Sequence, residues 1–221
     1  MTPRIVEKFL YHAVFQHEFK PLDELKPFDT REELWLSAAR QMQDPQRLLF
    51  LEFGVWQGYS IRYFSQHYAG PDSRFVGFDS FEGLPERWED KGKGFFSTRG
   101  SMPDIADSRV SFVKGWFQNS VPEYLAQLDV TKFSNVLVHF DADLYSSTLY
   151  LLSSFYKKIP RYYFVFDEFP GDETRALYNF VQATGATVRF FGRTGRSMQV
   201  FGEIDHGTGV YAPGPMQVRA G

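Results

Sequence analysis

Short runs of apolar residues alternate along the chain with segments whose apolar positions recur at helical spacing. Runs such as LLFLEF, NVLVHF and YYFVF are almost continuously apolar, which is typical of strands buried on both faces of a parallel sheet. Helices between such strands form right-handed crossovers, so the pattern predicts a Rossmann-like, doubly wound α/β fold. We expect strands at 48–53, 74–79, 110–114, 135–141 and 162–167, and helices at 58–68, 119–128, 145–157 and 172–184.

Two more strands are expected near the C-terminal end, at 187–191 and 197–204. Only the segment Gly192 to Arg196 separates them, which is too short for a helix. The two strands must therefore form a hairpin, and one of them must run antiparallel to its neighbours. The predicted sheet is mostly parallel with a C-terminal antiparallel hairpin.

The residues before the first strand predict helices outside this alternation. Apolar positions at helical spacing indicate a helix over 5–19, and Thr30 with Glu33 forms a capping box that begins a helix through about Gln43. The expected organisation has three parts: an N-terminal helical appendage or cap at 1–45, the α/β domain at 46–206, and a flexible tail rich in Gly and Pro at 207–221.

Composition narrows the class of protein. Of 221 residues, 43% are hydrophobic and 23% charged, which is typical of a globular domain. The net charge of -3 argues against a nucleic-acid partner, which needs clustered Lys and Arg. The chain has no Cys, which fits a reducing compartment and excludes thiolate zinc sites. No apolar run approaches the roughly 20 residues that span a bilayer, and the first residues do not resemble a signal peptide. We expect a cytoplasmic protein without a membrane partner.

In open α/β sheets, ligands bind beyond the carboxyl ends of the strands. Near the end of the first strand lies Glu52, followed by Gly54 and Gly58 in a G-x-x-x-G turn. Glycines let the backbone approach a ligand closely, and an acid before the turn suits a ligand with an ammonium or sulfonium charge. An ordinary strand-to-helix turn is the alternative. The same turn holds the further candidate contacts Val55, Trp56 and Ser60.

The next two strand ends add candidates for binding a nucleoside. Asp79 lies 25 residues after Gly54, where an acid can accept both ribose hydroxyls, and Ser80 follows it. A turn or cap residue is the other interpretation of Asp79. The third strand is followed by Gly115, Trp116 and Phe117, whose rings either bracket an adenine or pack in the core.

Acidic residues follow the fourth and fifth strands. Asp141 and Asp143 come after one apolar run, and Asp167 and Glu168 after the other. Adjacent carboxylates repel one another unless a cation or protons compensate, so a site for Mg²⁺ is one prediction. The alternative is that Asp143 caps a helix, Glu168 faces solvent and Asp141 orients a cofactor. His139 shares a strand face with Asp141, either as a general base or as a hydrogen-bonded core residue.

A long segment, 86–107, lies between the second and third strand units. Loops of this length in a compact domain are usually functional lids or disordered. Its Lys91, Lys93 and Arg99 favour an acceptor that carries carboxylate or phosphate, unless they are merely solvated.

Taken together, these segments resemble the class I S-adenosylmethionine-dependent methyltransferases of the macrocin O-methyltransferase-like family. The motifs that carry the resemblance are LEFGVWQGYS at 51–60, GFDSFEGLPERW at 77–88, GKGFF at 92–96, GWFQNSVPEYL at 115–125, HFDADLYSST at 139–148 and VFDEF at 165–169. The family fold is a seven-stranded sheet closed by an antiparallel hairpin, in agreement with the prediction from the pattern.

The resemblance implies roles for the candidate residues. Glu52, Gly54 and Gly58 would line the methionine end of the cofactor, Asp79 would hold the ribose, and residues 115–117 would flank the adenine. Metal-dependent relatives place a divalent cation on residues matching Asp141, Asp167 and Glu168. Here the last of these is Glu, one methylene longer than the Asp or Asn of those relatives.

The expected reaction is methyl transfer to a hydroxyl of a small molecule, a sugar or a natural product. In-line displacement at a sulfonium needs the acceptor oxygen to be positioned and its proton removed, for which Asp141, His139 and Asp167 are the candidates. Three alternatives stay open: a metal-independent O- or N-methyltransferase, a nicotinamide-dependent sugar dehydrogenase or epimerase, and a non-catalytic nucleoside-binding module. A nicotinamide-dependent dehydrogenase would need a G-x-G-x-x-G motif, which this sequence lacks. The sequence leaves the oligomeric state open, a homo-oligomer included.

Overall fold

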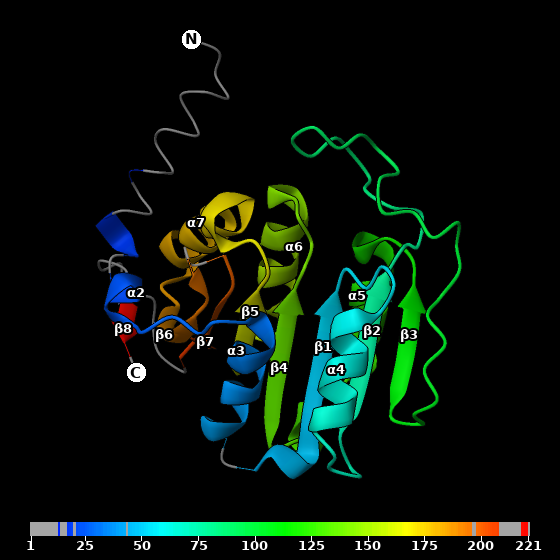
Figure 1. Cartoon of the computed structure of the whole chain (residues 1–221), viewed down its shortest axis with the longest axis horizontal. Coiled ribbons are helices and arrows are strands. Elements are labelled where there is room, and N and C mark those ends of the chain that lie inside the picture. The colour runs from blue at the N-terminus through cyan, green and yellow to red at the C-terminus, as the bar shows by residue number, and fades with distance from the viewer. Residues whose placement is uncertain are drawn as a thin grey trace.

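One mixed β-sheet forms the centre of the molecule in the computed structural model, which describes residues 13, 17–19, 21–42, 44–195, 198–207 and 218–220. The strand order is β3-β2-β1-β4-β5-β7-β6-β8 (Figure 1). The strands are β1 Leu48–Phe53, β2 Arg74–Asp79, β3 Val110–Lys114, β4 Asn135–Phe140, β5 Arg161–Phe166, β6 Thr187–Arg193, β7 Val200–Asp205 and β8 Val218–Ala220.

Helices cover both faces of the sheet. They are α2 Pro21–Glu24, α3 Arg31–Ser37, α4 Tyr59–His67, α5 Phe117–Gln127, α6 Tyr145–Phe155 and α7 Thr174–Thr184, with 3₁₀ turns at Ala38–Arg40, Pro45–Arg47 and Val130–Lys132 and a π-type turn at Phe169–Glu173. Residues of α3 and α4 share one hydrophobic cluster with one face of the central strands, and residues of α5, α6 and α7 share another with the opposite face. The doubly wound architecture is confirmed.

The strand directions agree with the sequence pattern. Strands β1 to β5 are parallel to one another, and β7 runs antiparallel between β5 and β6. The hairpin is confirmed, but its connection lies between Arg193 and Val200 rather than at Gly192 to Arg196, because β6 ends two residues later and β7 begins three residues later than predicted. The short β8 pairs with β6 and makes an eighth strand within the segment expected to be a tail.

Within the described residues, the helix before β1 packs onto the sheet. The helix expected at 5–19 lies mostly outside the described residues. The helix expected after Thr30 is confirmed as α3, although it ends at Ser37 and continues only as a 3₁₀ turn. Thr30 Oγ1 accepts the Glu33 N–H at 3.2 Å, as a capping box requires. Leu34 and Trp35 are fully buried, so α3 covers the sheet instead of standing apart from it.

Residues 80–109 connect β2 to β3 without any helix, which confirms the long connection predicted there. This segment passes over the carboxyl ends of the strands (Figure 1). Among the described residues, no helix has the length and apolar character that crossing a membrane requires.

Candidate active site

A cleft of about 260 Å³ lies at the carboxyl ends of the strands. All five predicted strand ends contribute to it, because β1 to β5 are parallel and end at the same edge of the sheet. The predicted residues that line it are Gly54, Trp56, Asp79, Ser80, Gly115, Trp116, Phe117, Asp141, Asp167 and Glu168. Glu52, Val55, Gly58, Ser60 and His139 are not among the residues that line it.

Asp79 fastens the turn that follows β1. Its Oδ2 accepts the N–H groups of Val55 and Trp56 at 2.8 and 2.9 Å, and its Oδ1 accepts the N–H of Phe81 at 2.7 Å. An ionised carboxylate offers about four lone-pair positions, so three backbone donors leave room for a ligand hydroxyl. Asp79 therefore both stabilises the turn and offers a hydrogen-bond acceptor at the surface of the cleft.

Gly54 allows that turn to cross the end of β4. A Cβ added to Gly54 would lie 1.8 Å from the carbonyl oxygen of Asp141, and its φ is +95°. Only glycine fits both conditions. Gly58 precedes α4 with a φ of +74°, and its added Cβ would lie 2.8 Å from the side chain of Pro103. Gly58 thus permits contact with the β2–β3 connection rather than with the cleft.

Glu52, Ser60 and His139 form a buried polar group beneath the cleft. Glu52 and His139 are fully buried, and Glu52 Oε1 lies 2.9 Å from His139 Nδ1 and accepts the Ser60 hydroxyl. Burial raises the pKa of Glu52. Burial alone would lower the pKa of His139, but its interactions with Asp167 and Glu52 raise that pKa to about 10. The group that Glu52 faces is therefore the His139 ring, and not a ligand in the cleft.

Four carboxylates line one part of the cleft. Burial, with Asp167 nearby, raises the pKa of Asp141 well above its ordinary value, and burial with Glu168 nearby raises the pKa of Asp143 to about 7. The pKa of Glu168 is raised by burial and by Asp167. Asp143 makes no side-chain cap of α6 and has a φ of +59°, a conformation that non-glycine residues rarely adopt. Such strain is common at functional sites.

The predicted metal ligands share the cleft without forming a chelating set. Within the described ranges, no three His, Asp or Glu side chains are placed to hold one metal ion. Asp167 Oδ1 instead accepts the side-chain N–H of Gln199 and lies 3.8 Å from His139 Nε2. The residues as placed therefore do not fit a bound divalent cation.

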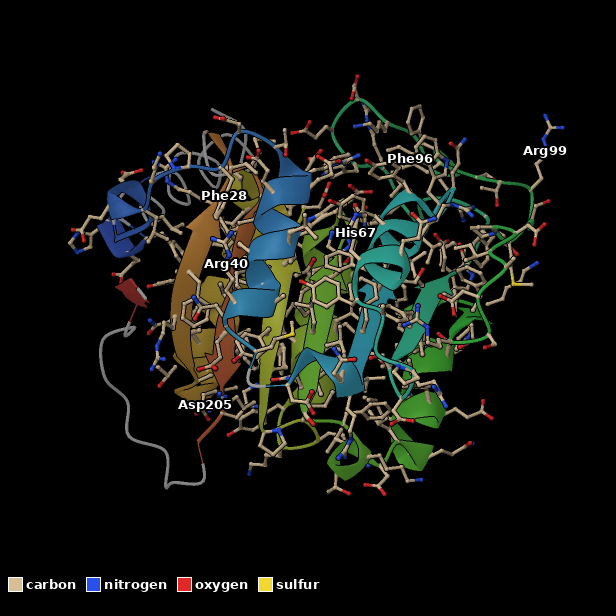
Figure 2. All side chains as sticks on the ribbon, turned by 60° about the horizontal axis from the view of Figure 1, so that its bottom comes forward. Phe28, Arg40, His67, Phe96, Arg99 and Asp205 are labelled. Atoms are coloured by element: carbon tan, nitrogen blue, oxygen red, sulfur yellow. The ribbon has the colours of Figure 1, made fainter. Side chains whose placement is uncertain are left out.

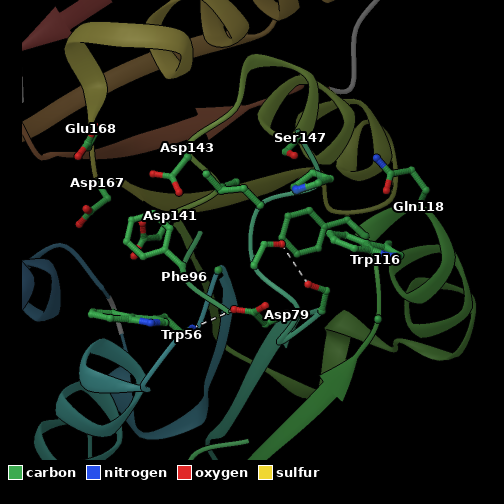
Figure 3. Close-up of a pocket in the computed structure, with 18 of the residues that line it drawn as sticks. Trp56, Asp79, Phe96, Trp116, Gln118, Asp141, Asp143, Ser147, Asp167 and Glu168 are labelled. Atoms are coloured by element: carbon green, nitrogen blue, oxygen red, sulfur yellow. Dashed lines mark hydrogen bonds between the residues drawn. The ribbon is translucent and has the colours of Figure 1, made fainter. Parts of the chain in front are cut away.

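Aromatic rings form two walls. Figure 3 shows Trp116 on one side of the cleft, and Trp56 and Phe96 with Asp167 and Glu168 on the other. The rings of Trp56 and Phe96 lie 5.6 Å apart and nearly perpendicular, and both residues have a positive φ. Trp56 is 46% exposed, so much of its face is open to a ligand. Flat apolar faces of this kind suit adenine rings and sugar or aromatic acceptors.

The basic residues of the β2–β3 connection are not among the residues that line the cleft. Lys91 Nζ lies over the Trp88 ring at 3.9 Å, Lys93 is exposed, and Arg99 projects away from the body of the molecule (Figure 2). Among the described residues that line the cleft, Arg31 is the only Lys or Arg.

Sequence analysis missed several lining residues. Arg31 lies on a helix outside every quoted motif, and nothing local indicates that it faces the cleft. The other missed residues belong to motifs that carry the resemblance, which therefore contained a signal for them: Leu84, Pro85, Phe96, Gln118 and Ser147.

The cleft has the features that a cationic sulfur nucleoside requires. A glycine turn brings the backbone close, Asp79 retains hydrogen-bonding capacity, Trp116 offers a ring face, and carboxylates compensate a positive charge. The residues present therefore fit S-adenosylmethionine.

Solved structures with similar folds were found at low identity. TomG, an O-methyltransferase from Streptomyces achromogenes solved with S-adenosylmethionine, is 16% identical over 93% of this chain and 90% of its own, with a TM-score of 0.46. An O-methyltransferase from Bacillus cereus, solved with S-adenosylhomocysteine, is 12% identical over 93% and 91%, with a TM-score of 0.46. A putative ribosomal RNA methyltransferase from Plasmodium falciparum is 14% identical over 80% and 97%, with a TM-score of 0.49.

A search among curated proteins found no significant match. The family profile described as macrocin-O-methyltransferase (TylF) matches residues 42–187, well over half of the chain. This range begins just after α3 and includes all five strand ends that build the cleft. The chain thus belongs to the macrocin O-methyltransferase family of S-adenosylmethionine-dependent methyltransferases.

Proposed function

We propose that this protein transfers the methyl group of S-adenosylmethionine to a hydroxyl of a small-molecule acceptor, a sugar or a natural product. The observation that carries this proposal is the division of the cleft. Asp79 and Trp116 suit a nucleoside, whereas Trp56 and Phe96 stand beside Asp167 and Glu168 on the other side (Figure 3). An acceptor with a flat apolar face and a hydroxyl would fill that second part.

Within this proposal, the chain's own residues position the acceptor and remove its proton. The bound cofactor would supply an electrophilic methyl group. Asp141 is the base we assign, because it lines the cleft and because, once ionised, a carboxylate whose pKa is raised accepts a proton more readily than an exposed one. His139, with a pKa of about 10, is already protonated near neutral pH and has no lone pair to accept another proton. Its role would be electrostatic, beside Asp167.

The experiment is calorimetric titration with S-adenosylhomocysteine, followed by release of that product from S-adenosylmethionine in the presence of catechol and methyl hexopyranosides. We expect binding, and transfer to at least one hydroxyl. Asp141→Asn should lower kcat by about 10²-fold to 10⁴-fold. Absence of heat on titration would overturn the proposal, and mass spectrometry of the product distinguishes O- from N-methylation.

Chelation with EDTA tests whether methyl transfer depends on Mg²⁺. Because the carboxylates as placed do not form a three-ligand set, we expect transfer to persist after treatment with EDTA. Activity that is lost on chelation and restored by Mg²⁺ in the wild type, but is not restored by Mg²⁺ in Asp167→Ala, would contradict this expectation. It would mean that Asp141, Asp167 and Glu168 rearrange around a cation.

A further inference from the structure

A chain of polar contacts runs from α3 to the cleft. Trp35 Nε1 donates to Gln199 Oε1 at 2.9 Å, and Gln199 Nε2 donates to Asp167 Oδ1. Trp35 is fully buried and Gln199 is 5% exposed, whereas Asp167 lines the cleft. We propose that Trp35 and Gln199 are positioning residues that hold the carboxylate of Asp167 in place for methyl transfer. This inference rests on the proposed function for its catalytic meaning only.

The hydrogen-bond donors and acceptors in this series of contacts can be arranged in one way only. An indole nitrogen donates and cannot accept, so the amide oxygen of Gln199 must face Trp35. The amide nitrogen must then face Asp167, and Asp167 must accept. Trp35 therefore determines which end of the amide the carboxylate meets. Without the indole N–H, the amide would be free to turn its oxygen toward Asp167 and repel it.

The backbone around Gln199 is anchored as well. The N–H of Gln199 donates to Thr194 Oγ1, and the N–H of Thr194 donates to the Gln199 carbonyl, both at 2.9 Å. The N–H of Phe169, two residues after Asp167, donates to the Met198 carbonyl at 2.8 Å. The connection between β6 and β7 and the segment after β5 are thus joined through backbone and side chain together.

Both contacts of Asp167 fall on the same oxygen. Oδ1 accepts from Gln199 and lies 3.8 Å from His139 Nε2, while the side chain remains 21% exposed. Oδ2 is then the oxygen that can meet an acceptor hydroxyl. A carboxylate held by one oxygen presents the other in a defined direction, and misplacement by about 1 Å can reduce a rate by about 10²-fold.

The proposal also changes the meaning of the N-terminal segment. Trp35 belongs to α3, which lies before the range matched by the family profile. A residue expected to be part of an appendage would then act on the active site through Gln199, the residue immediately before β7.

The first test measures the physical connection. The chain has four Trp, so a ¹⁵N-labelled sample gives four indole N–H resonances, and Trp35→Phe identifies the one from Trp35. Asp167→Asn should shift that resonance through Gln199. Asp143→Asn also removes a charge from the cleft but lies outside the chain of contacts, so it should leave the resonance in place. An unmoved resonance in Asp167→Asn would overturn the proposal.

The second test measures catalysis with the acceptor identified under the proposed function. Trp35→Phe and Gln199→Met should each lower kcat by about 10-fold to 100-fold while the Kd for S-adenosylhomocysteine stays unchanged. The double variant should be no slower than the slower single variant, because both substitutions interrupt the same chain. Multiplying losses would instead indicate two independent effects and contradict the proposal.

Tyr163→Phe is the matched control. Tyr163 is buried in the same hydrophobic cluster as Trp35, and its hydroxyl donates to the Gln41 carbonyl at 2.7 Å. Loss of this bond should lower Tm and leave kcat unchanged, whereas an equal loss of kcat would mean that Trp35 acts through packing alone. Failure of the proposed function can be distinguished from failure of this inference. If only the proposed function fails, wild-type protein binds no S-adenosylhomocysteine, but Asp167→Asn still shifts the indole resonance.

Discussion

At Gly54 the backbone of the turn after β1 passes against the carbonyl of Asp141. Gly54→Ala would place a Cβ 1.8 Å from that oxygen at a positive φ. We expect the free energy of unfolding to fall by roughly 2–5 kcal/mol and affinity for S-adenosylhomocysteine to be lost. Urea unfolding and calorimetry measure both. Gly92→Ala is the control, because nothing lies within 4 Å of its added Cβ; equal effects of the two substitutions would contradict this account.

His206 gives the fold a sensitivity to acid. Burial lowers its pKa from 6.5 to about 4, and its ring packs against Tyr156, Tyr162 and Phe180. Since the unfolded chain binds this proton near pH 6.5 and the folded chain only near pH 4, stability is lost as pH falls between those values. Because His206 as a whole is half-buried, we expect a loss of about 1–2 kcal/mol.

His206→Phe should remove this loss. The comparison is urea unfolding of both proteins at pH 7 and pH 4.5. Wild-type protein should lose more stability than the variant over that interval, and parallel losses would show that other groups are responsible.

Some contacts of single residues can be predicted from the sequence, and others cannot. Glu52 and His139 are direct partners in the parallel register of β1 and β4, so their pairing follows once those strands are known to be neighbours. No local pattern contains that fact. Trp35 and Gln199 are 164 residues apart, and only tertiary packing brings them together. Asp79, by contrast, is predictable from local sequence, because it ends a strand and lies 25 residues after Gly54.

At the scale of elements, local signals predict the order and type of most strands and helices, although they do not predict β8. Strands β1 and β2 have the predicted bounds, because continuous apolar runs bordered by turns define them. Helix α5 begins at Phe117, two residues earlier than predicted. A start at 119 would have left Pro122 in the first turn, where proline is best tolerated. The longer helix accepts Pro122 in its interior, and packing of Val121 and Leu125 compensates.

Thr30 makes the N-cap of α3, so Thr30→Ala should lower the free energy of unfolding by about 1 kcal/mol. The cause is loss of the acceptor for the Glu33 N–H. Chemical unfolding provides the measurement. In Ser37→Ala the lost hydroxyl donates to a carbonyl within the same helix, so a smaller effect is expected; a larger one would contradict the cap's importance.

For the whole molecule, the sheet order decides where chemistry can occur. The cleft draws on the ends of five strands, so a ligand there binds the folded state alone. At 100 times its Kd, S-adenosylhomocysteine should stabilise the protein by about 2.7 kcal/mol, seen as a rise in Tm. A nicotinamide dinucleotide at the same concentration should leave Tm unchanged, and a rise with it would favour the dehydrogenase alternative.

The helix-free connection between β2 and β3 bears on how such a protein can acquire new acceptors. Residues 80–109 contribute Leu84, Pro85 and Phe96 to the cleft. The N–H of Gly100 donates a hydrogen bond to the Phe81 carbonyl and so joins two distant parts of this segment. Because no crossover helix fixes this stretch against the sheet, its sequence can diverge while the strand ends that recognise the nucleoside stay intact. Exchange of residues 80–109 between two family members should therefore transplant substrate preference and preserve cofactor affinity.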